Sequence, residues 1–257
     1  MGQHLGAPAE PIVAPGDKVK VGQLIANANG FISAPVHSSV SGTVKGIEII
    51  KDLAGNPCKA VVIEVEGDEW VETIDRSEEI AREIKLDSKE IIEKIKECGV
   101  VGLGGATFPT NVKLSPPPGK KAEFLIINGA ECEPYLTSDY RVLLEMPEQV
   151  LIGAAIMMKA LNVTQGFVGI EENKPEAIRI MTEKAKAYPQ IKIVSLKKKY
   201  PQGGEKQLID AVVGRKVPSM GLPIDTGAVV QNVGTALAVY EAVQKNKPLF
   251  EGIMTIT

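Results

Sequence analysis

The chain has 257 residues, 44% of them hydrophobic, which is enough for one large domain or for a large and a small domain, each with a buried core. Its formal net charge is −3, and only 4% of its residues are aromatic. These values exclude the basic surface of a DNA-binding protein and the stacking platforms of a single-strand binder, so we expect no nucleic-acid partner.

The first part of the chain alternates short apolar runs with turn residues, as expected for a small β sandwich or barrel. The runs that we predict to be strands are 12–13, 23–26, 42–44 and 60–65. The stretches 15–24 and 34–44 resemble the two halves of a biotinyl/lipoyl-type barrel-sandwich hybrid domain, which we place at residues 1–75. Carrier members of that family have a lysine at the tip of the central hairpin. The matching stretch 36–40 has none, so we expect the domain to be unmodified.

The segment 76–98 alternates charged residues with isoleucines at mostly helical spacing. We predict a helical linker, that is, a linker plus a helix whose apolar face docks on the next domain and whose charges face solvent. We expect Trp70, just before it, to pack at the seam between the two domains.

From residue 99 to 257, predicted strands alternate with predicted helices, which favours an α/β domain with a mostly parallel sheet. The predicted strands are 123–128, 163–170 and 191–196. The predicted helices are 141–161 (split at Pro147), 175–188, 205–213 (ended by Gly214) and 234–243. Open α/β sheets bind their ligands at the carboxyl ends of the strands, so we look for a site there.

A glycine-rich segment opens this domain, with four glycines among the seven residues 99–105. Glycine has no Cβ and tolerates positive φ, so main-chain N–H groups of such a loop can converge on a phosphate or a flavin ring. The spacing is not the dinucleotide fingerprint, because no apolar strand leads into it. Phe108-Pro109 stiffens the exit, and Lys113 follows as a mobile cation.

Three polar motifs follow, each at a predicted strand end or helix start. N-G-A-E-C-E-P at 128–134 places an amide and two carboxylates directly after a strand. Y-P-Q-G-G-E at 200–205 and Q-N-V-G-T at 231–235 each open a helix, and Asn232 is a good N-cap whose helix offers free amides to a phosphate. Taken singly, each motif is explained better by turns and helix caps than by a ligand site.

The cysteines and histidines indicate no further site. Cys58, Cys98 and Cys132 are scattered, which fits a reducing compartment and neither a disulfide framework nor a cluster bound by this chain. His4 and His37 have no partner at ligand spacing, so we expect both on the surface or in turns and expect no metal site.

In this order, the four motifs resemble the flavin-binding NADH dehydrogenase subunit of respiratory complex I. They resemble still more closely the C subunit of the Rnf-type ion-translocating electron transport complex, through the stretches 3–11, 34–37 and 129–134. The resemblance implies a Rossmann-like FMN- and NADH-binding α/β domain over residues 99–257. It implies FMN contacts by Gly102, Gly104, Gly105, Lys113, Asn128, Glu131, Tyr200, Gly203, Asn232 and Thr235, and NADH contacts by Glu133 and Glu205. No residue is assigned a catalytic role of its own.

The same resemblance implies an NADH-oxidising module of a membrane-associated complex, peripheral on the cytoplasmic face of the bacterial inner membrane. Its partners would be the other subunits and, indirectly, ferredoxin. The family continues into a domain with [4Fe-4S] clusters, which would lie in a C-terminal part beyond this sequence; we interpret the chain as a fragment. The alternatives are a scaffold subunit that has lost its flavin and a related cobalamin reductase.

This chain departs from complex I at three places in these motifs. Ala130 stands where complex I has an acid, and Thr107 replaces a glycine. The stretch 217–223 lacks the lysine and the phenylalanine that complex I uses near NADH. The resemblance therefore supports the flavin site more strongly than the NADH site.

Overall fold

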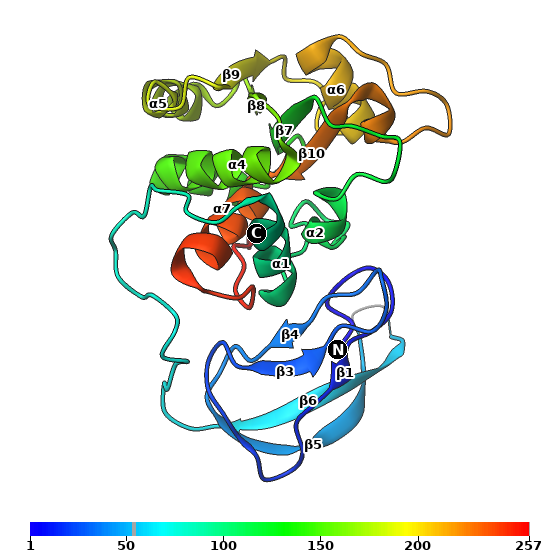
Figure 1. The fold of residues 1–257 in the computed structure, drawn as a ribbon, viewed down its shortest axis with the longest axis vertical. Coiled ribbons are helices and arrows are strands. Elements are labelled where there is room, and N and C mark those ends of the chain that lie inside the picture. The colour runs from blue at the N-terminus through cyan, green and yellow to red at the C-terminus, as the bar shows by residue number, and fades with distance from the viewer. Residues whose placement is uncertain (53–54, 257) are drawn as a thin grey trace.

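The computed structural model describes residues 1–52 and 55–256. A small β domain lies at one end, an α/β domain lies at the other, and a long extended segment joins them along one side (Figure 1). This arrangement confirms the predicted fold class: an α/β domain preceded by a small barrel-sandwich hybrid.

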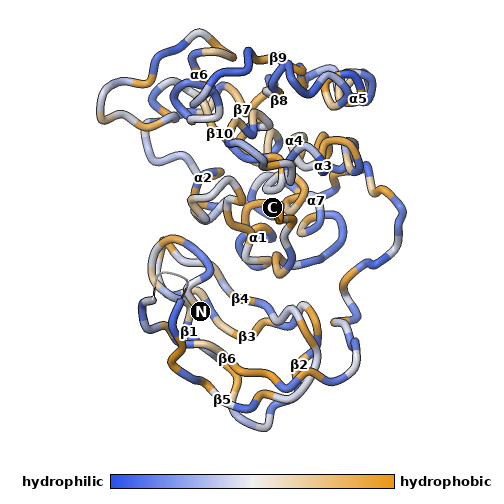
Figure 2. The backbone as a smooth tube through the Cα atoms, turned by 180° about the vertical axis from the view of Figure 1, so that it is seen from behind, coloured by the Kyte–Doolittle hydropathy of each residue, from blue (hydrophilic) through white to orange (hydrophobic). Residues whose placement is uncertain are grey.

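The β domain is built from two three-stranded sheets. Their orders are β1-β3-β4 and β2-β5-β6. The strands are β1 (Glu10–Pro11), β2 (Lys18–Val19), β3 (Leu24–Asn27), β4 (Val36–His37), β5 (Gly42–Lys51) and β6 (Pro57–Val65). Small apolar side chains fill the space between the sheets, among them Val19, Ile25, Val36 and Val44. Much of β5 and β6 is coloured hydrophobic in Figure 2, whereas α5 of the other domain (Pro175–Ala185) is mostly hydrophilic.

The segment 76–98 consists of a linker followed by one helix, α1 (Ser88–Glu97), in agreement with the prediction of a linker plus a helix. Asp87 starts the helix: its side chain accepts bonds from Lys89 N and Glu90 N in a capping box. The linker before α1 is bonded to the last helix of the chain, Val233–Lys245. Gln244 Nε2, on that helix, donates to the carbonyl oxygens of Ala81 and Glu83. The predicted docking of the helix is confirmed, because Ile91 and Ile95 are fully buried in the main core.

The α/β domain contains a four-stranded sheet in the order β10-β7-β8-β9, with every pair parallel. Its strands are β7 (Phe124–Gly129), β8 (Gln165–Glu171), β9 (Ile191–Leu196) and β10 (Ala228–Asn232). The sequence did not predict β10. Its apolar run is only three residues long, Ala228 to Val230, and it passes straight into the last helix.

The helices form unequal layers on the two faces of the sheet. They are α2 (Thr110–Lys113), α3 (Ser138–Glu145), α4 (Pro147–Leu161), α5 (Pro175–Ala185), α6 (Glu205–Val213) and α7 (Val233–Lys245), with a 3₁₀ turn at Pro223–Thr226. Pro147 separates α3 from α4, as predicted. Helices α1, α4, α5 and α7 share the large core on one face, and α6 covers the smaller core on the other.

The seam between the domains is held by contacts at several points. Trp70 packs edge-on against Phe250 with ring centroids 5.6 Å apart, and Arg76 lies 4.3 Å above its ring, which confirms the prediction for Trp70. Nearby, Lys245 Nζ lies 2.7 Å from Asp75 Oδ2. At the other end of the seam, Leu5 N donates to Thr107 O over 3.0 Å.

The prediction that His37 lies on the surface or in a turn is wrong. It lies in β4 and is half-buried, and its Nδ1 is buried without a hydrogen-bond partner within the described residues. A Cβ on Gly99 would lie 2.5 Å from Pro35 O and 3.6 Å from His37 Nδ1, so this hairpin packs directly on the chain that leads to the glycine-rich segment. Burial lowers the pKa of His37 to about 4.

Candidate flavin site at the carboxyl edge of the sheet

The predicted motifs gather at the carboxyl ends of the strands. Asn128 and Asn232 are paired in register where β7 and β10 end. The glycine-rich segment reaches the same place, since Leu103 N donates to Thr235 Oγ1 in the first turn of α7 over 2.9 Å. The 200–205 motif joins them through Gly203 O, which accepts from Asn128 Nδ2, so four stretches far apart in the sequence meet at one edge of the sheet.

The glycine-rich segment lies against the start of α7, and at Gly104 there is no space for a side chain between the two. A Cβ on Gly104 would lie 3.2 Å from Asn232 Cβ, which is tighter than an ordinary contact. Gly102 N donates to Phe108 O over 2.9 Å, which closes the loop on itself. Gly105 has φ +105°, a conformation that other residues rarely adopt. Around Gly104 and Gly105 the loop therefore presents main chain, while the Leu103 side chain lies beside Gly234 at the start of α7.

Asn232 caps α7, as predicted. Its Oδ1 accepts from Gly234 N over 2.8 Å and from Thr235 N over 3.3 Å. Its Nδ2 donates to Asp139 Oδ2 over 2.6 Å. The side-chain amide is thus fixed in one orientation by partners on both sides.

Lys113 and Glu205, which were predicted to contact different cofactors, contact each other. Lys113 Nζ lies 2.7 Å from Glu205 Oε1 and donates to Val230 O over 3.1 Å. The two side chains are about one-third exposed, 33% and 38%. This ion pair connects α2 to the N-terminus of α6 across the carboxyl end of β10.

Hydrogen bonds join the 128–134 motif to the 200–205 motif. Asn128 Nδ2 donates to Gly203 O over 2.9 Å, and Gly203 N donates to Cys132 Sγ over 3.4 Å. A Cβ on Gly203 would lie 3.2 Å from that sulfur. Tyr200, at the start of the second motif, is largely exposed, and so is Glu133.

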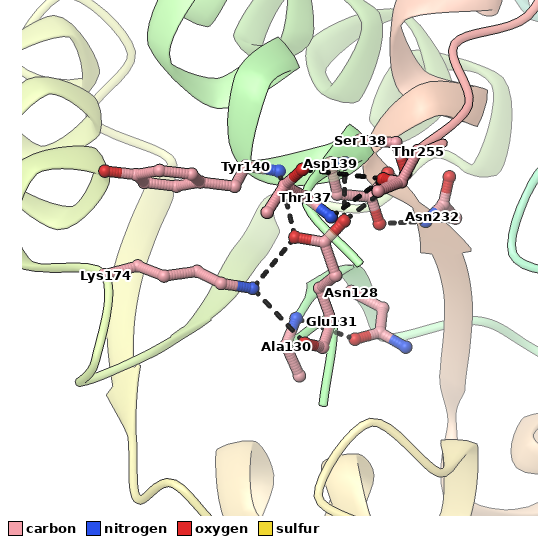
Figure 3. A network of polar contacts seen from close by, with 10 residues as sticks. All are labelled: Asn128, Ala130, Glu131, Thr137, Ser138, Asp139, Tyr140, Lys174, Asn232 and Thr255. Carbon is pink, nitrogen blue, oxygen red and sulfur yellow. Dashed lines mark hydrogen bonds and ion pairs between the residues drawn. The ribbon is translucent and has the colours of Figure 1, made fainter. Parts of the chain in front are cut away.

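Glu131 is buried and fully bonded (Figure 3). Its Oε1 accepts from Ser138 Oγ and Asp139 N, and its Oε2 accepts from Tyr140 N and from Lys174 Nζ at 3.0 Å. The Glu131 and Lys174 side chains are only 3% and 10% exposed. The carboxylate therefore holds the N-terminus of α3 and the start of α5, and its predicted contact with flavin stays a prediction.

Asp139 is a residue of this region that sequence reasoning missed. Burial, with the nearby negative charge of Glu131, raises the pKa of its carboxyl to about 6. In the sequence it is an ordinary acid in a first helical turn. No sequence pattern around Asp139 indicates its hydrogen bond with Asn232, which is 93 residues away.

Several buried polar atoms near this edge have no hydrogen-bond partner within the described residues. They are Thr110 Oγ1 at the start of α2, Glu171 Oε1 at the end of β8, and Gln231 Nε2 next to the end of β10. Unsatisfied buried polar atoms are rare in proteins and are typical of places where a ligand or ordered water supplies the missing bond. Within the described chain, no group of three or more His, Cys, Asp or Glu side chains is placed to hold a metal ion.

An open parallel sheet with a glycine-rich loop and a capped helix N-terminus at its carboxyl edge defines a nucleotide- or flavin-binding α/β domain. The Nuo51 FMN-binding domain family matches residues 95–241, and the chain belongs to this family. The RnfC barrel sandwich hybrid domain matches residues 1–68.

Curated relatives match the whole chain. The C subunit of the proton-translocating ferredoxin:NAD(+) oxidoreductase complex of Clostridium ljungdahlii is 52% identical over 99% of this chain and 55% of the relative. The C subunit of the Na(+)-translocating complex of Acetobacterium woodii is 45% identical over 100% of this chain and 58% of the relative. The chain thus spans a little over half the length of these two relatives.

Solved structures share the fold of part of the chain. An NAD+-reducing [NiFe]-hydrogenase in the air-oxidized state is 25% identical, with a TM-score of 0.53, over 62% of this chain and 30% of the hydrogenase chain. No helix in the described part of the chain is long and apolar enough to cross a membrane.

Proposed function

We propose that this chain is the FMN- and NADH-binding module of the C subunit of a membrane-associated, ion-translocating ferredoxin:NAD+ oxidoreductase complex. The observation that supports it most directly is the glycine-rich loop, which around Gly104 presents bare main chain at the capped N-terminus of α7. The names of the relatives and the family match support the same proposal. The other subunits of the complex, ferredoxin reached through them, and the cytoplasmic face of the membrane are parts of this proposal.

The residues present fit FMN. Gly104 lets the loop lie close to Asn232, a Cβ on Gly105 would meet no atom within 4 Å and so leaves open space beside the loop, and the dipole of α7 favours negative charge at its N-terminus. The unpartnered buried atoms near this edge, among the described residues, include a donor, Gln231 Nε2, and an acceptor, Glu171 Oε1. FMN has both kinds of group, in its phosphate and carbonyl oxygens and in its ribityl hydroxyls.

The protein's contribution is binding and orientation. When bound, FMN supplies the redox chemistry, accepting hydride from NADH and passing electrons on singly. In this proposal Lys113 contributes a positive charge to flavin binding and Glu205, with which it is paired, accepts hydrogen bonds from nucleotide hydroxyls. The hydrogen bond from Asn128 Nδ2 to Gly203 O holds the 128–134 and 200–205 motifs next to each other.

The proposal is tested by titrating the protein with FMN and following flavin fluorescence. We expect saturable binding in the micromolar range or tighter, and we expect Gly104→Leu to abolish it because the side chain would occupy the space beside Asn232. Gly46→Leu is the matched control, since a Cβ there meets no atom within 4 Å. Unchanged FMN binding by Gly104→Leu would contradict the assignment of the loop.

A flavin-free scaffold is the second candidate function. It is favoured by the fact that Lys113 and Asn232 already have partners within the chain, Glu205 and Asp139. The same titration separates the two candidates. A flavin module binds FMN in the micromolar range or tighter, whereas a flavin-free scaffold shows no saturable binding. Bleaching of the FMN-loaded protein by NADH then tests the nucleotide site separately.

A further inference from the structure

We propose that Glu171, the last residue of β8, is a flavin-binding residue, and that its carboxylate accepts a hydrogen bond from an N–H or O–H group of the flavin. The proposal rests on the proposed function, because it takes a flavin as the ligand. It assigns a role to a residue that none of the predicted motifs contains.

The first observation is that Glu171 is buried while one of its oxygen atoms has no donor. The residue is 2% exposed, and its Oε1 has no hydrogen-bond partner within the described residues. Lys174, the nearest cation in the sequence, pairs with Glu131 instead. The side chain of Glu131 is also buried, yet both of its carboxylate oxygens accept hydrogen bonds from the chain. The fold thus supplies donors to one buried carboxylate at this edge of the sheet and leaves an oxygen of the other without one.

This arrangement has a cost in the flavin-free protein. An ionised carboxylate can only accept hydrogen bonds, and a buried acceptor that has lost water without gaining a donor raises the free energy of the folded state. A ligand that brings a donor to Glu171 removes this cost when it binds. The buried oxygen therefore favours the complex over the free protein.

The second observation is the position of Glu171 on the sheet. Gly169, two residues earlier, faces α6, since a Cβ there would lie 3.1 Å from the side chain of a leucine in that helix. Side chains two residues apart in a strand share a face, so Glu171 lies on the α6 face as well. Strands β7 and β8 stay in register up to Gly129 and Ile170, which places Ala130 and Glu171 at the next positions of the two chains.

The 128–134 and 200–205 motifs meet on this same face. A Cβ on Gly203 would lie 3.5 Å from Ala130 Cβ and 3.8 Å from Asn128 Nδ2. The donors of these residues are used within the chain, because Asn128 Nδ2 donates to Gly203 O and Ala130 N donates to Asn128 Oδ1. The Ala130 side chain has no polar atom. We infer that the donor for Glu171 comes from the ligand bound at this edge.

A flavin has two kinds of donor that suit a carboxylate. The oxidised ring has one N–H group, at N3, and the ribityl chain has hydroxyl groups, whereas the phosphate of FMN is an acceptor at neutral pH. Glu171 should therefore contribute equally to the binding of FMN and of riboflavin. Removal of a hydrogen bond to a charged group should weaken binding roughly 10- to 100-fold.

The first measurement is fluorescence titration of wild type, Glu171→Met and Glu171→Gln with FMN and with riboflavin. Methionine has about the length of glutamate without its acceptors, whereas glutamine keeps one carbonyl oxygen and loses the charge. We expect Glu171→Met to lose affinity roughly 10- to 100-fold for both ligands, and Glu171→Gln to lose less. Glu172→Met, at the exposed neighbouring acid, is the matched control and should bind both flavins as wild type does.

The second measurement is urea denaturation of the flavin-free proteins. Glu171→Met removes a buried acceptor that has no donor, so we expect it to be at least as stable as wild type. A purely structural role of Glu171 predicts the opposite, because the variant would then lose contacts that hold the free protein together. Weaker flavin binding by a protein of undiminished stability is the result that supports the proposal.

Lumiflavin, which has the ring but no ribityl chain, distinguishes the two kinds of donor. Weaker lumiflavin binding by Glu171→Met assigns the ring N3–H, and an unchanged lumiflavin affinity with weakened riboflavin binding assigns a ribityl hydroxyl. Unchanged FMN and riboflavin affinity in Glu171→Met, or destabilisation of its flavin-free form, would overturn the proposal. Failure of wild type to bind either FMN or riboflavin would instead overturn the proposed function.

Discussion

Lys174 and Glu131 form the most deeply buried ion pair that the structure describes, and their burial makes a stability prediction. Lys174→Met would leave Glu131 buried and without its counter-charge. Removing one member of a buried pair costs about 3–5 kcal/mol, so we expect a loss of that order in the free energy of unfolding, measured by urea denaturation.

Lys186→Met is the matched control for this prediction. Lys186 pairs with Glu183, but both side chains are about two-thirds exposed, and an exposed pair contributes about 0–1 kcal/mol. Equal destabilisation by the two variants would show that the Lys174 pair is not the structural anchor of α3 and α5.

Lys113 gives a second prediction at the scale of one residue, now for binding. A hydrogen bond to a charged group contributes roughly 1.5–3 kcal/mol, so Lys113→Met should weaken FMN binding about 10- to 100-fold. The measurement is the same fluorescence titration. An equal loss of riboflavin affinity would place Lys113 at the ring and not at the phosphate, and Lys120→Met, which removes a lysine paired with Asp225, serves as control.

At the scale of elements, the sequence predicts a helix boundary correctly where one residue determines it. Pro147 separates α3 from α4 because it cannot continue a helix, and Asn232 caps α7 because its side chain bonds to the first amides. The capping box at Asp87 fixes where α1 begins, which the spacing of the isoleucines alone does not.

The contacts within the candidate site were harder to predict because they join distant segments. The sequence supplied Lys113 and Glu205 as separate motifs, but not the ion pair across 92 residues. It supplied Glu131 as a possible ligand, but not the fold of the following helix that surrounds it with donors. Pairings of this kind depend on the complete sheet, including β10, which local patterns did not reveal.

The packing of α4 against α7 gives a prediction for Gly153. A Cβ there would lie 1.9 Å from Ala236 O, so the two helix backbones are in direct contact. Alanine favours a helix over glycine by about 1 kcal/mol, but overpacking costs typically 1–3 kcal/mol and here meets backbone. We expect Gly153→Ala to lower the free energy of unfolding by about 2 kcal/mol, with Gly46→Ala as the control. A stabilised Gly153→Ala would contradict the close approach.

At the scale of the whole molecule, the two domains are joined near the candidate site as well as by the extended segment. The N-terminal segment bonds to the glycine-rich loop through Leu5 N and Thr107 O, and the β4 hairpin packs on Gly99. The hairpin that bears the modified lysine in carrier domains is therefore used here as a contact surface. We infer that the β domain helps to fix the position of the glycine-rich loop.

His37 lies in that contact, and its titration gives a prediction for the pH dependence of stability. Burial lowers its pKa from 6.5 to about 4 in the folded protein, so the unfolded chain binds the proton first as pH falls. The stabilising contribution is present above pH 6.5 and is lost as pH falls toward 4. Between pH 7 and pH 5 this loss amounts to about 1–2 kcal/mol. Asp139 acts in the opposite sense, because its raised pKa makes the folded state less stable as pH rises from 3.8 through about 6.

The two contributions are separated by comparing wild type with His37→Gln, since Asp139 is the same in both. We expect the free energy of unfolding of wild type to fall by about 1–2 kcal/mol more than that of His37→Gln between pH 7 and pH 5, measured by urea denaturation at each pH. His4→Gln is the control, because it removes the chain's other histidine and leaves the contact with Gly99 intact. If His37→Gln kept the full pH dependence of wild type, the imidazole would not be buried in solution, and the close packing of the β4 hairpin on the glycine-rich segment would have to be abandoned.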